Sequence, residues 1–300
     1  MKRERHIFIG IDLGGPRGKT TAVARLETRG APAPVLVEDV DLRAPGGEPW
    51  HDDALIEYLE SVGQGAVIAF DAPLTAPACI RCQIPRCPGT ERCDVPAVVW
   101  LRTKGAELRA QAEMADRDRI AAIPSSQSYS SAADPAAGQA RRLAPYTHRC
   151  TEVLHHYTRG LVRREALSRG PGPVSARAIH LRRVLAGKGY DLNVNMLEVS
   201  PRSTVQALFG ERRARGYKRD ADPWVTRAAI LESLADDLVF SQRSRLAKDE
   251  VLRNDHCFDA LLSGYTAYLW ATEGWELPAG QEALFDDDGW IWVPPHGGSD

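Results

Sequence analysis

The sequence predicts an α/β fold in which a mixed sheet is flanked by helices. Three observations lead to this fold class: three strand-like segments precede the first helical segment, a short apolar segment follows it, and most of the remaining chain has helical periodicity. A short segment that is apolar throughout is typical of a strand buried at the centre of a sheet. The 300 residues, 43% hydrophobic and 26% charged, have the composition of ordinary folded proteins, which excludes disordered and collagen-like chains.

The N-terminal quarter holds four predicted strands and one predicted helix. The first strand is apolar and β-branched up to Asp12, and the second alternates polar and apolar residues as a half-buried antiparallel strand does. The helix has Asp52 and Asp53 in its first turn, where acidic residues favour helix formation. The fourth strand, AVIAF, ends at Asp71. The strands are expected at 6–12, 20–27, 35–42 and 66–70, and the helix at 51–63.

Beyond residue 77 the pattern is mainly helical. Helices are predicted at 97–118, 147–168, 174–188, 203–209, 223–237 and 251–272, with a strand at 193–199 and a closing strand in GWIWVP at 289–294. Residues 124–138 consist mostly of Ser, Ala, Pro and Gln, which predicts a surface loop. Because the chain has no internal repeat and no linker, we expect one domain over residues 1–300, with a cysteine-rich knuckle at 77–95 and a helical and loop insertion at about 97–190.

Acidic residues stand at the ends of predicted strands. Asp12 ends the first strand in GIDLGG, Asp71 ends the fourth in AFDAPL, and Glu198 ends a later one in MLEVSPR. A carboxylate in this position lies at the rim of the sheet, where acids from several strands can converge on hard divalent cations. Each acid alone could equally be a turn residue, but their occurrence together in this order favours a metal site.

The last long helix adds three candidates. In NDHCFDALL, Asp259 lies four residues after Asp255 and three after His256, so all three side chains can point to one side of the helix. Because Asp is also common as a helix cap, a purely structural role is the alternative for these residues.

The order of the elements, with an acid at the end of the first and fourth strands, is that of the ribonuclease H-like architecture. The chain resembles a family of predicted nucleases with this fold, the domain of unknown function 429, which is related to RuvC-type Holliday-junction resolvases. The resemblance is carried by GID at 10–12, IAFDAPL at 68–74, PYTHRCTEV at 145–153, EVSPRS at 198–203, YKR at 217–219 and DHCFDALLSGYTA at 255–267. It implies that Asp12, Asp71 and Asp259 occupy the positions of the metal-binding acids in the related resolvases.

The resemblance also implies roles for neighbouring residues. Glu198 matches the Glu of the family's EV-x-P motif, and His256 stands where relatives have His or Asp. Many members have a second Asp before the final DA pair, where this chain has His256 preceded by Asp255, so either residue could meet a second metal ion. The expected catalytic residues are Asp12, Asp71, Glu198, Asp255, His256 and Asp259.

The implied reaction is hydrolysis of phosphodiester bonds in DNA or RNA with two Mg²⁺ or Mn²⁺ ions, one generating hydroxide and one stabilising the leaving oxygen. Basic residues are expected to bind the phosphates of this nucleic acid. They are Lys218, Arg219, Arg149 and Arg202. Two structural alternatives stay open: the basic stretch 211–219 could be a solvated turn, and Arg149 could pair with Glu152 on a helix.

Charge and hydropathy limit the classes of partner. With 38 basic and 40 acidic residues the net charge is −2, which excludes a globally basic nucleic-acid binder and requires any such site to be local. The apolar runs fall well short of the roughly 18 residues that a membrane span needs. The first residues, MKRERHIFIG, lack the apolar segment of a signal peptide, so we expect a cytoplasmic protein.

The glycine-rich turn in GIDLGGPRGKTT suggests two other kinds of phosphate site. A P-loop is excluded, because Leu13 stands where GxxxxGK[ST] requires Gly. The turn is also similar to the first phosphate motif of the sugar kinase, actin and Hsp70-like superfamily, but in those proteins a second glycine-rich turn follows the fourth strand. This chain has DAPLTAP there, with two prolines. An ATP-binding phosphotransferase or ATPase is therefore the main alternative, and a non-catalytic nucleic-acid-binding protein is another.

Four of the six cysteines form a cluster with the spacing C-x2-C-x4-C-x5-C, at Cys79, Cys82, Cys87 and Cys93. In a reducing compartment such a cluster binds metal more often than it forms disulfides. The spacing differs from the paired C-x2-C halves of a zinc ribbon and from the ferredoxin run C-x2-C-x2-C-x3-C. Four thiolates in a tetrahedron suit Zn²⁺ in a closed structural site, an iron–sulfur cluster is the alternative, and unligated thiols are the third possibility. Cys150 and Cys257 stand alone and are expected to be buried apolar residues.

Overall fold

A computed structural model describes residues 3–15, 20–29, 33–121, 143–161, 172–242 and 244–295. The chain divides into two compact units, Met1–Thr75 with Leu167–Asp300, and Ala76–Ala166. We call them the sheet unit and the helical unit and describe each by itself. The surface loop expected at 124–138 lies outside the described residues, as do residues 16–19 of the glycine-rich turn.

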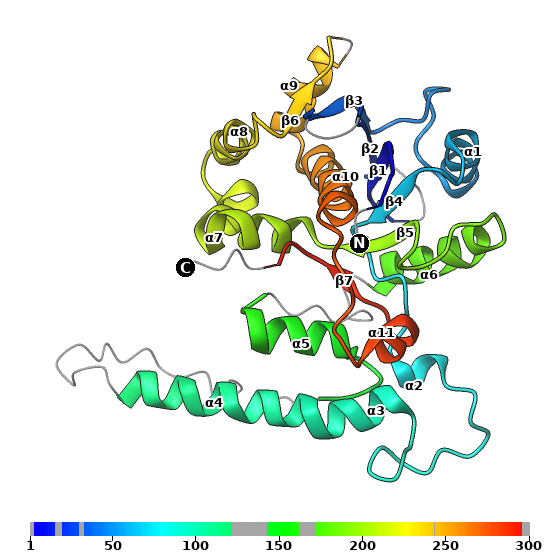
Figure 1. Ribbon diagram of the computed structural model, residues 1–300, viewed down its shortest axis with the longest axis vertical. Helices are drawn as coiled ribbons and strands as arrows, with labels where there is room; N and C mark the ends of the chain where they lie inside the picture. Colours follow the sequence, from blue (N-terminus) through cyan, green and yellow to red (C-terminus); the bar gives the residue numbers. More distant parts are fainter. Residues whose placement is uncertain are drawn as a thin grey trace. The chain divides into compact units, whose positions relative to one another are not determined.

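The sheet unit contains one mixed sheet, which confirms the predicted fold class (Figure 1). Its described strands are β1 (Ile7–Asp12), β2 (Ala22–Glu27), β3 (Val35–Asp41), β4 (Val67–Phe70), β5 (Met196–Val199), β6 (Leu238–Phe240) and β7 (Ile291–Trp292). They lie in the order β6-β3-β2-β1-β4-β5-β7. The pairs β1–β2 and β2–β3 are antiparallel and the others are parallel. Strand β6 was not predicted, because three residues at a sheet edge are too few to show an alternating pattern.

The described helices of the sheet unit are α1 (Asp52–Val62), α6 (Gly172–Ala186), α7 (Pro201–Arg219), α8 (Pro223–Ser233), α9 (Arg245–Arg253), α10 (Asp255–Glu273) and α11 (Glu282–Asp288). One prediction about them is confirmed and another was wrong. The helical segment predicted at 203–209 ends at a kink at Gly210, whose φ of 82° and ψ of 167° are not helical, and a second helical segment that was not predicted continues α7 to Arg219. The helix predicted at 251–272 is two helices, because Asn254 has extended backbone and its side chain accepts a hydrogen bond from the His256 amide.

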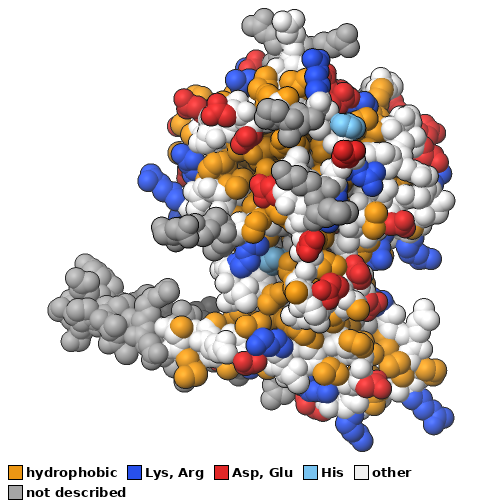
Figure 2. Space-filling view, in the orientation of Figure 1, with side chains coloured by type: hydrophobic (Ala, Val, Ile, Leu, Met, Phe, Trp, Pro, Cys, Tyr) orange, Lys and Arg blue, Asp and Glu red, His pale blue; other side chains and the backbone are white. Residues whose placement is uncertain are grey.

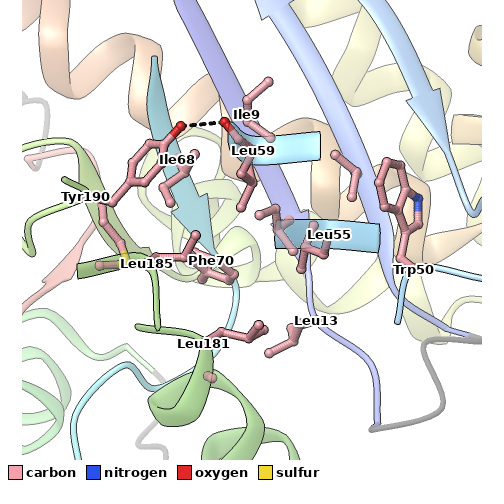
Figure 3. Close-up of a cluster of buried hydrophobic side chains, with 14 of the residues drawn as sticks. Ile9, Leu13, Trp50, Leu55, Leu59, Ile68, Phe70, Leu181, Leu185 and Tyr190 are labelled. Atoms are coloured by element: carbon pink, nitrogen blue, oxygen red, sulfur yellow. Dashed lines mark hydrogen bonds between the residues drawn. The ribbon is translucent and has the colours of Figure 1, made fainter. Parts of the chain in front are cut away.

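A hydrophobic core lies between one face of the sheet and helices α1 and α6. Figure 3 shows side chains of β1 and β4 packed against Leu55 and Leu59 of α1 and Leu181 and Leu185 of α6. The Tyr190 hydroxyl donates to the Leu59 carbonyl across 2.7 Å, which joins the chain after α6 to α1. The buried residues labelled for the two strands are Ile9, Ile68 and Phe70.

Helix α10 covers the other face with its backbone directly against β1. A Cβ atom added to Gly10 would lie 2.0 Å from the Ala260 carbonyl oxygen and 2.2 Å from the Gly264 nitrogen. Only glycine therefore permits this approach. Nearly all of α10 is buried as a result, from Cys257 to Ala271.

The helical unit contains α2 (Ala78–Arg81), α3 (Pro96–Trp100), a π-helical turn η1 (Leu101–Gly105), α4 (Ala106–Ala121) and α5 (Cys150–Arg159). These elements confirm the helix predicted at 97–118. Helix α5 ends earlier than predicted, because Gly160 follows it with a left-handed backbone of φ 65°. None of the described helices combines the length and apolar character needed to cross a bilayer.

Candidate metal centre

The alternation of side chains along β1 fixes the direction of Asp12. Ile9 and Ile11 belong to the core under α1 and α6, so the intervening Gly10, and Asp12 after it, face α10. The same holds for β4, where Ile68 and Phe70 belong to that core and Asp71 continues on the opposite face. Both acids therefore point toward α10.

The two strand ends lie side by side. Strands β1 and β4 are parallel neighbours, and the Asp71 amide donates to the Ile11 carbonyl across 2.8 Å. Because α10 packs on Gly10 through Ala260 and Gly264, Asp259 lies over the same end of the sheet.

Asp12, Asp71 and Asp259 are brought together at this point. Each offers a carboxylate oxygen, and these oxygens all lie within 4.8 Å of one another. Within the ranges that the structure describes, no other group of three His, Cys, Asp or Glu side chains meets this distance. The expected convergence of the three acids is confirmed, and we call them the acidic triad.

Three neighbouring side chains bind the triad. His256 Nδ1 lies 2.6 Å from Asp12 Oδ2, the Tyr217 hydroxyl donates to Asp259 Oδ1 across 2.9 Å, and Lys218 Nζ donates to Asp259 Oδ2. Tyr217 and Lys218 come from the C-terminal turns of α7, and His256 from the first turn of α10. The break at Asn254 starts α10 at Asp255, which places His256 in the first turn of this helix, beside Asp12.

Burial makes the triad electrostatically unfavourable without a cation. Asp259 is 1% exposed, and burial raises the pKa of its carboxyl to about 7, with Asp12 and Asp71 adding to the shift and Lys218 opposing it. Burial also raises the pKa of Asp12, against the hydrogen bond from His256. Burial opposes the charge of Lys218, but the three carboxylates together raise its pKa above the ordinary value.

A family model described as a protein of unknown function, DUF429, matches residues 10–283. The chain belongs to the DUF429 family. No curated protein and no solved structure matches it significantly. All three acids lie within the matched residues.

The triad of this DUF429 chain suits a hard divalent cation. Carboxylate oxygens are the donors that Mg²⁺ and Mn²⁺ prefer, and a cation among three carboxylates would offset the repulsion that raises their pKa values. The acidic triad is therefore a possible divalent-metal site.

Two further acids expected at the centre do not join the triad. Glu198 lies two residues after Met196 on β5, so both side chains lie on the same face of the sheet. Met196 belongs to the core under α1 and α6, so this is the face opposite to the one on which the acidic triad lies. It is 2% exposed, and its Oε2 accepts a hydrogen bond from the Leu74 amide across 2.9 Å. Asp255 lies half-buried at the start of α10 and is absent from the group.

Of the basic residues expected to bind phosphate, only Lys218 contacts the acidic triad in the described residues. Lys218 lies at the triad, and Arg219 is exposed at the end of α7. Arg202 donates to Glu211 Oε1 across 2.8 Å on the same helix. The stretch 211–219 is thus helical and not a turn. On the face seen in Figure 2, the described Lys and Arg side chains are mixed with acidic ones, as the net charge led us to expect.

Arg149 belongs to the helical unit and is fully buried. Its guanidinium lies 3.0 Å from Glu152 Oε1, and its backbone amide donates to Glu152 Oε2 across 3.1 Å. This geometry matches the intrahelical ion pair that the sequence left open as an alternative to phosphate binding.

Sequence reasoning missed Arg177 of α6, which holds the glycine-rich turn beside Asp12. Its guanidinium donates to the carbonyl oxygens of Gly14 and Gly15 at 2.9 and 3.0 Å, and to Thr21 Oγ1 at 2.8 Å. It also pairs with Asp52 across 2.7 Å. Nothing local marks this arginine, because its partners lie more than a hundred residues away in the sequence.

The four clustered cysteines do not form the compact knuckle expected at 77–95. No three of their sulfur atoms lie mutually within 4.8 Å, as one tetrahedral ion would require. The reason is that residues 82–92 are exposed and do not pack into a core of their own. Cys150 and Cys257 are fully buried, as predicted.

Proposed function

We propose that this protein is a divalent-metal-dependent nuclease that hydrolyses phosphodiester bonds. The observation that carries the proposal is the acidic triad at the carboxyl ends of β1 and β4, with Lys218 bound to one of its members. The topology supports the ribonuclease H-like assignment on which the proposal draws, since three antiparallel strands are followed by the parallel strands β4 and β5.

Asp12, Asp71 and Asp259 would hold two Mg²⁺ or Mn²⁺ ions. When bound, such ions would supply a water molecule of lowered pKa and would stabilise charge on the leaving oxygen. The other residues orient these ligands: His256 fixes Asp12 through Oδ2, and Tyr217 fixes Asp259 through Oδ1.

Lys218 has a double role in this proposal. Without metal its ammonium group is the cation nearest to Asp259, whose charge it balances. Its side chain is 38% exposed, so it can turn from the carboxylate to a phosphate of a DNA or RNA strand when metal binds. The exposed Arg219 next to it adds a second positive charge for the same strand.

The segment after β4 argues against the ATPase alternative. A nucleotide phosphate at that turn needs free backbone donors. The Leu74 amide already donates to Glu198, and the carboxylate of Glu198 would repel a phosphate there. A nuclease is therefore the better account of the centre.

The decisive experiment measures cleavage of labelled single-stranded, duplex and junction DNA and of RNA, with Mg²⁺, Mn²⁺ or EDTA. We expect cleavage with either metal, none in EDTA, and none by Asp12→Asn with its fold intact. Asp249→Asn, which changes an exposed acid on α9, is the matched control and should cleave normally. Cleavage that persists in EDTA or in Asp12→Asn would disprove the proposal, and metal-stimulated ATP hydrolysis without cleavage would favour the alternative.

A further inference from the structure

We propose that Cys79, Cys82, Cys87 and Cys93 bind an iron–sulfur cluster in the helical unit. This site is separate from the acidic triad, and the inference does not depend on the nuclease activity. It rests on how the chain presents the four sulfur atoms and on the space left among them.

All four cysteines line one pocket, with a volume of about 150 Å³. Cys79 lies in α2, Cys82 directly follows that helix, and Cys93 lies just before α3. Cys87, from the loop between them, lines the same pocket. Four cysteines from four places in the loop therefore border one small space.

The two ends of this loop are held by a turn before α5 and by the π-helical turn η1. The Cys79 amide donates to the Pro145 carbonyl across 3.0 Å. At the other end, Arg102 of η1 donates to the carbonyls of Thr90 and Cys93 at 2.5 and 3.2 Å. Cys79 and Cys93 are thus held at the two ends of the loop, while residues 82–92 between them are exposed.

The separation of the sulfur atoms distinguishes a cluster from a single ion. One zinc ion with Zn–S bonds of about 2.3 Å holds its four thiolates roughly 3.5–4 Å apart. Here no three sulfurs lie mutually within 4.8 Å, although all four line the pocket. An iron–sulfur cluster holds its thiolates farther apart, because iron and sulfide ions lie between them. The sulfurs are therefore too far apart for one zinc ion, and this wider spacing is the direction in which a cluster differs from a single ion.

The lining of the pocket agrees with this ligand. Apart from the cysteines it consists of Ala78, Ile84, Pro88, Thr90, Val95 and Val98, with no charged side chain. Burial raises the pKa of the Cys79 thiol, and the other three cysteines raise it further, so the four groups are near enough to interact. Iron ions bound by the thiolates would remove this repulsion.

The test uses the full chain, produced with added iron and purified without oxygen. We expect iron and acid-labile sulfide in nearly equal amounts and visible absorption that dithionite bleaches. A chain that is isolated empty is reconstituted with ferrous iron and sulfide before the measurement. Zinc without iron and sulfide, or no metal after reconstitution, would overturn the proposal.

Variants locate the cluster. Cys82→Ser and Cys87→Ser should lose iron and sulfide, whereas Cys150→Ser should keep both, because Cys150 lies buried on α5 and does not line the pocket. Circular dichroism checks that each variant is folded, and a folded Cys87→Ser chain that keeps a full cluster would refute the assignment. Asp12→Asn should keep the cluster, because Asp12 does not line the pocket. The cluster can therefore be tested even if the proposed nuclease function is disproved.

Discussion

Replacing Asp259 by Asn tests whether the acidic triad lowers the stability of the metal-free protein. The carboxyl group has an ordinary pKa of 3.8, and burial raises the value to about 7 in the folded chain. Between these pH values the folded protein keeps a proton that the unfolded chain has released. The free energy of unfolding therefore falls as pH rises from about 4 to about 7. A difference of about three pKa units corresponds to a loss of about 4 kcal/mol at neutral pH.

The Asn variant has no such proton to lose. Tyr217 can still donate to the amide oxygen, and the half-exposed Lys218 can turn to solvent. In EDTA we expect the variant to be more stable than the wild type above about pH 7, by as much as about 4 kcal/mol, and to depend less on pH. Urea unfolding between about pH 5 and pH 8 measures both quantities.

Metal narrows this difference in stability. Mn²⁺ at a hundred times its Kd should stabilise the wild type by about 2.7 kcal/mol and leave Asp259→Asn nearly unchanged. Asp249→Asn should behave as the wild type in both experiments. Parallel pH profiles for wild type and Asp259→Asn, or equal stabilisation of the two by Mn²⁺, would refute the reasoning.

Three further substitutions test other parts of the structure. Gly10→Ala should destabilise the protein by about 3 kcal/mol or more in urea unfolding, because the new Cβ would overlap the backbone of α10. Gly65→Ala has open space around it and should cost less than about 1 kcal/mol. Arg177→Met should cost about 3 kcal/mol, since it leaves the buried Gly14 carbonyl without this donor, and an unchanged midpoint would contradict the role of this arginine. Lys218→Met should bind Mn²⁺ about tenfold more tightly, because a competing cation is lost, yet cleave more slowly; calorimetry showing weaker binding would exclude that competition.

The strands and the triad could be predicted from the sequence because their signals are local. An apolar run that ends in Asp gives both the strand and the position of the acid, as at Asp12 and Asp71. Asp259 could be predicted as a site residue because it lies three residues after His256 on one helix, so both side chains can point to the same side. The alternation along β5 shows that Glu198 and Met196 share a face, but it does not show which face of the sheet that is. The structure supplies this information by placing Met196 in the core under α1 and α6.

Other features depend on contacts that no local pattern records. Tyr217 and Lys218 reach Asp259 only because α7 continues past Gly210. Arg177 meets the glycine-rich turn across more than 150 residues of sequence. The sequence spacing of the cysteines left a single ion, a cluster and unligated thiols open, because the distances among the sulfur atoms depend on how the folded loop is held.

The contact of α10 with β1 also determines how the centre responds to sequence drift. The separation of Asp12 from Asp259 is set by main-chain atoms at Gly10, Ala260 and Gly264, which have no rotamers to change. Substitutions among the large apolar residues under α1 and α6 act on the other side of the sheet. That core can therefore exchange one hydrocarbon side chain for another over evolutionary time while the spacing between the two carboxylates is kept, as long as both glycines remain.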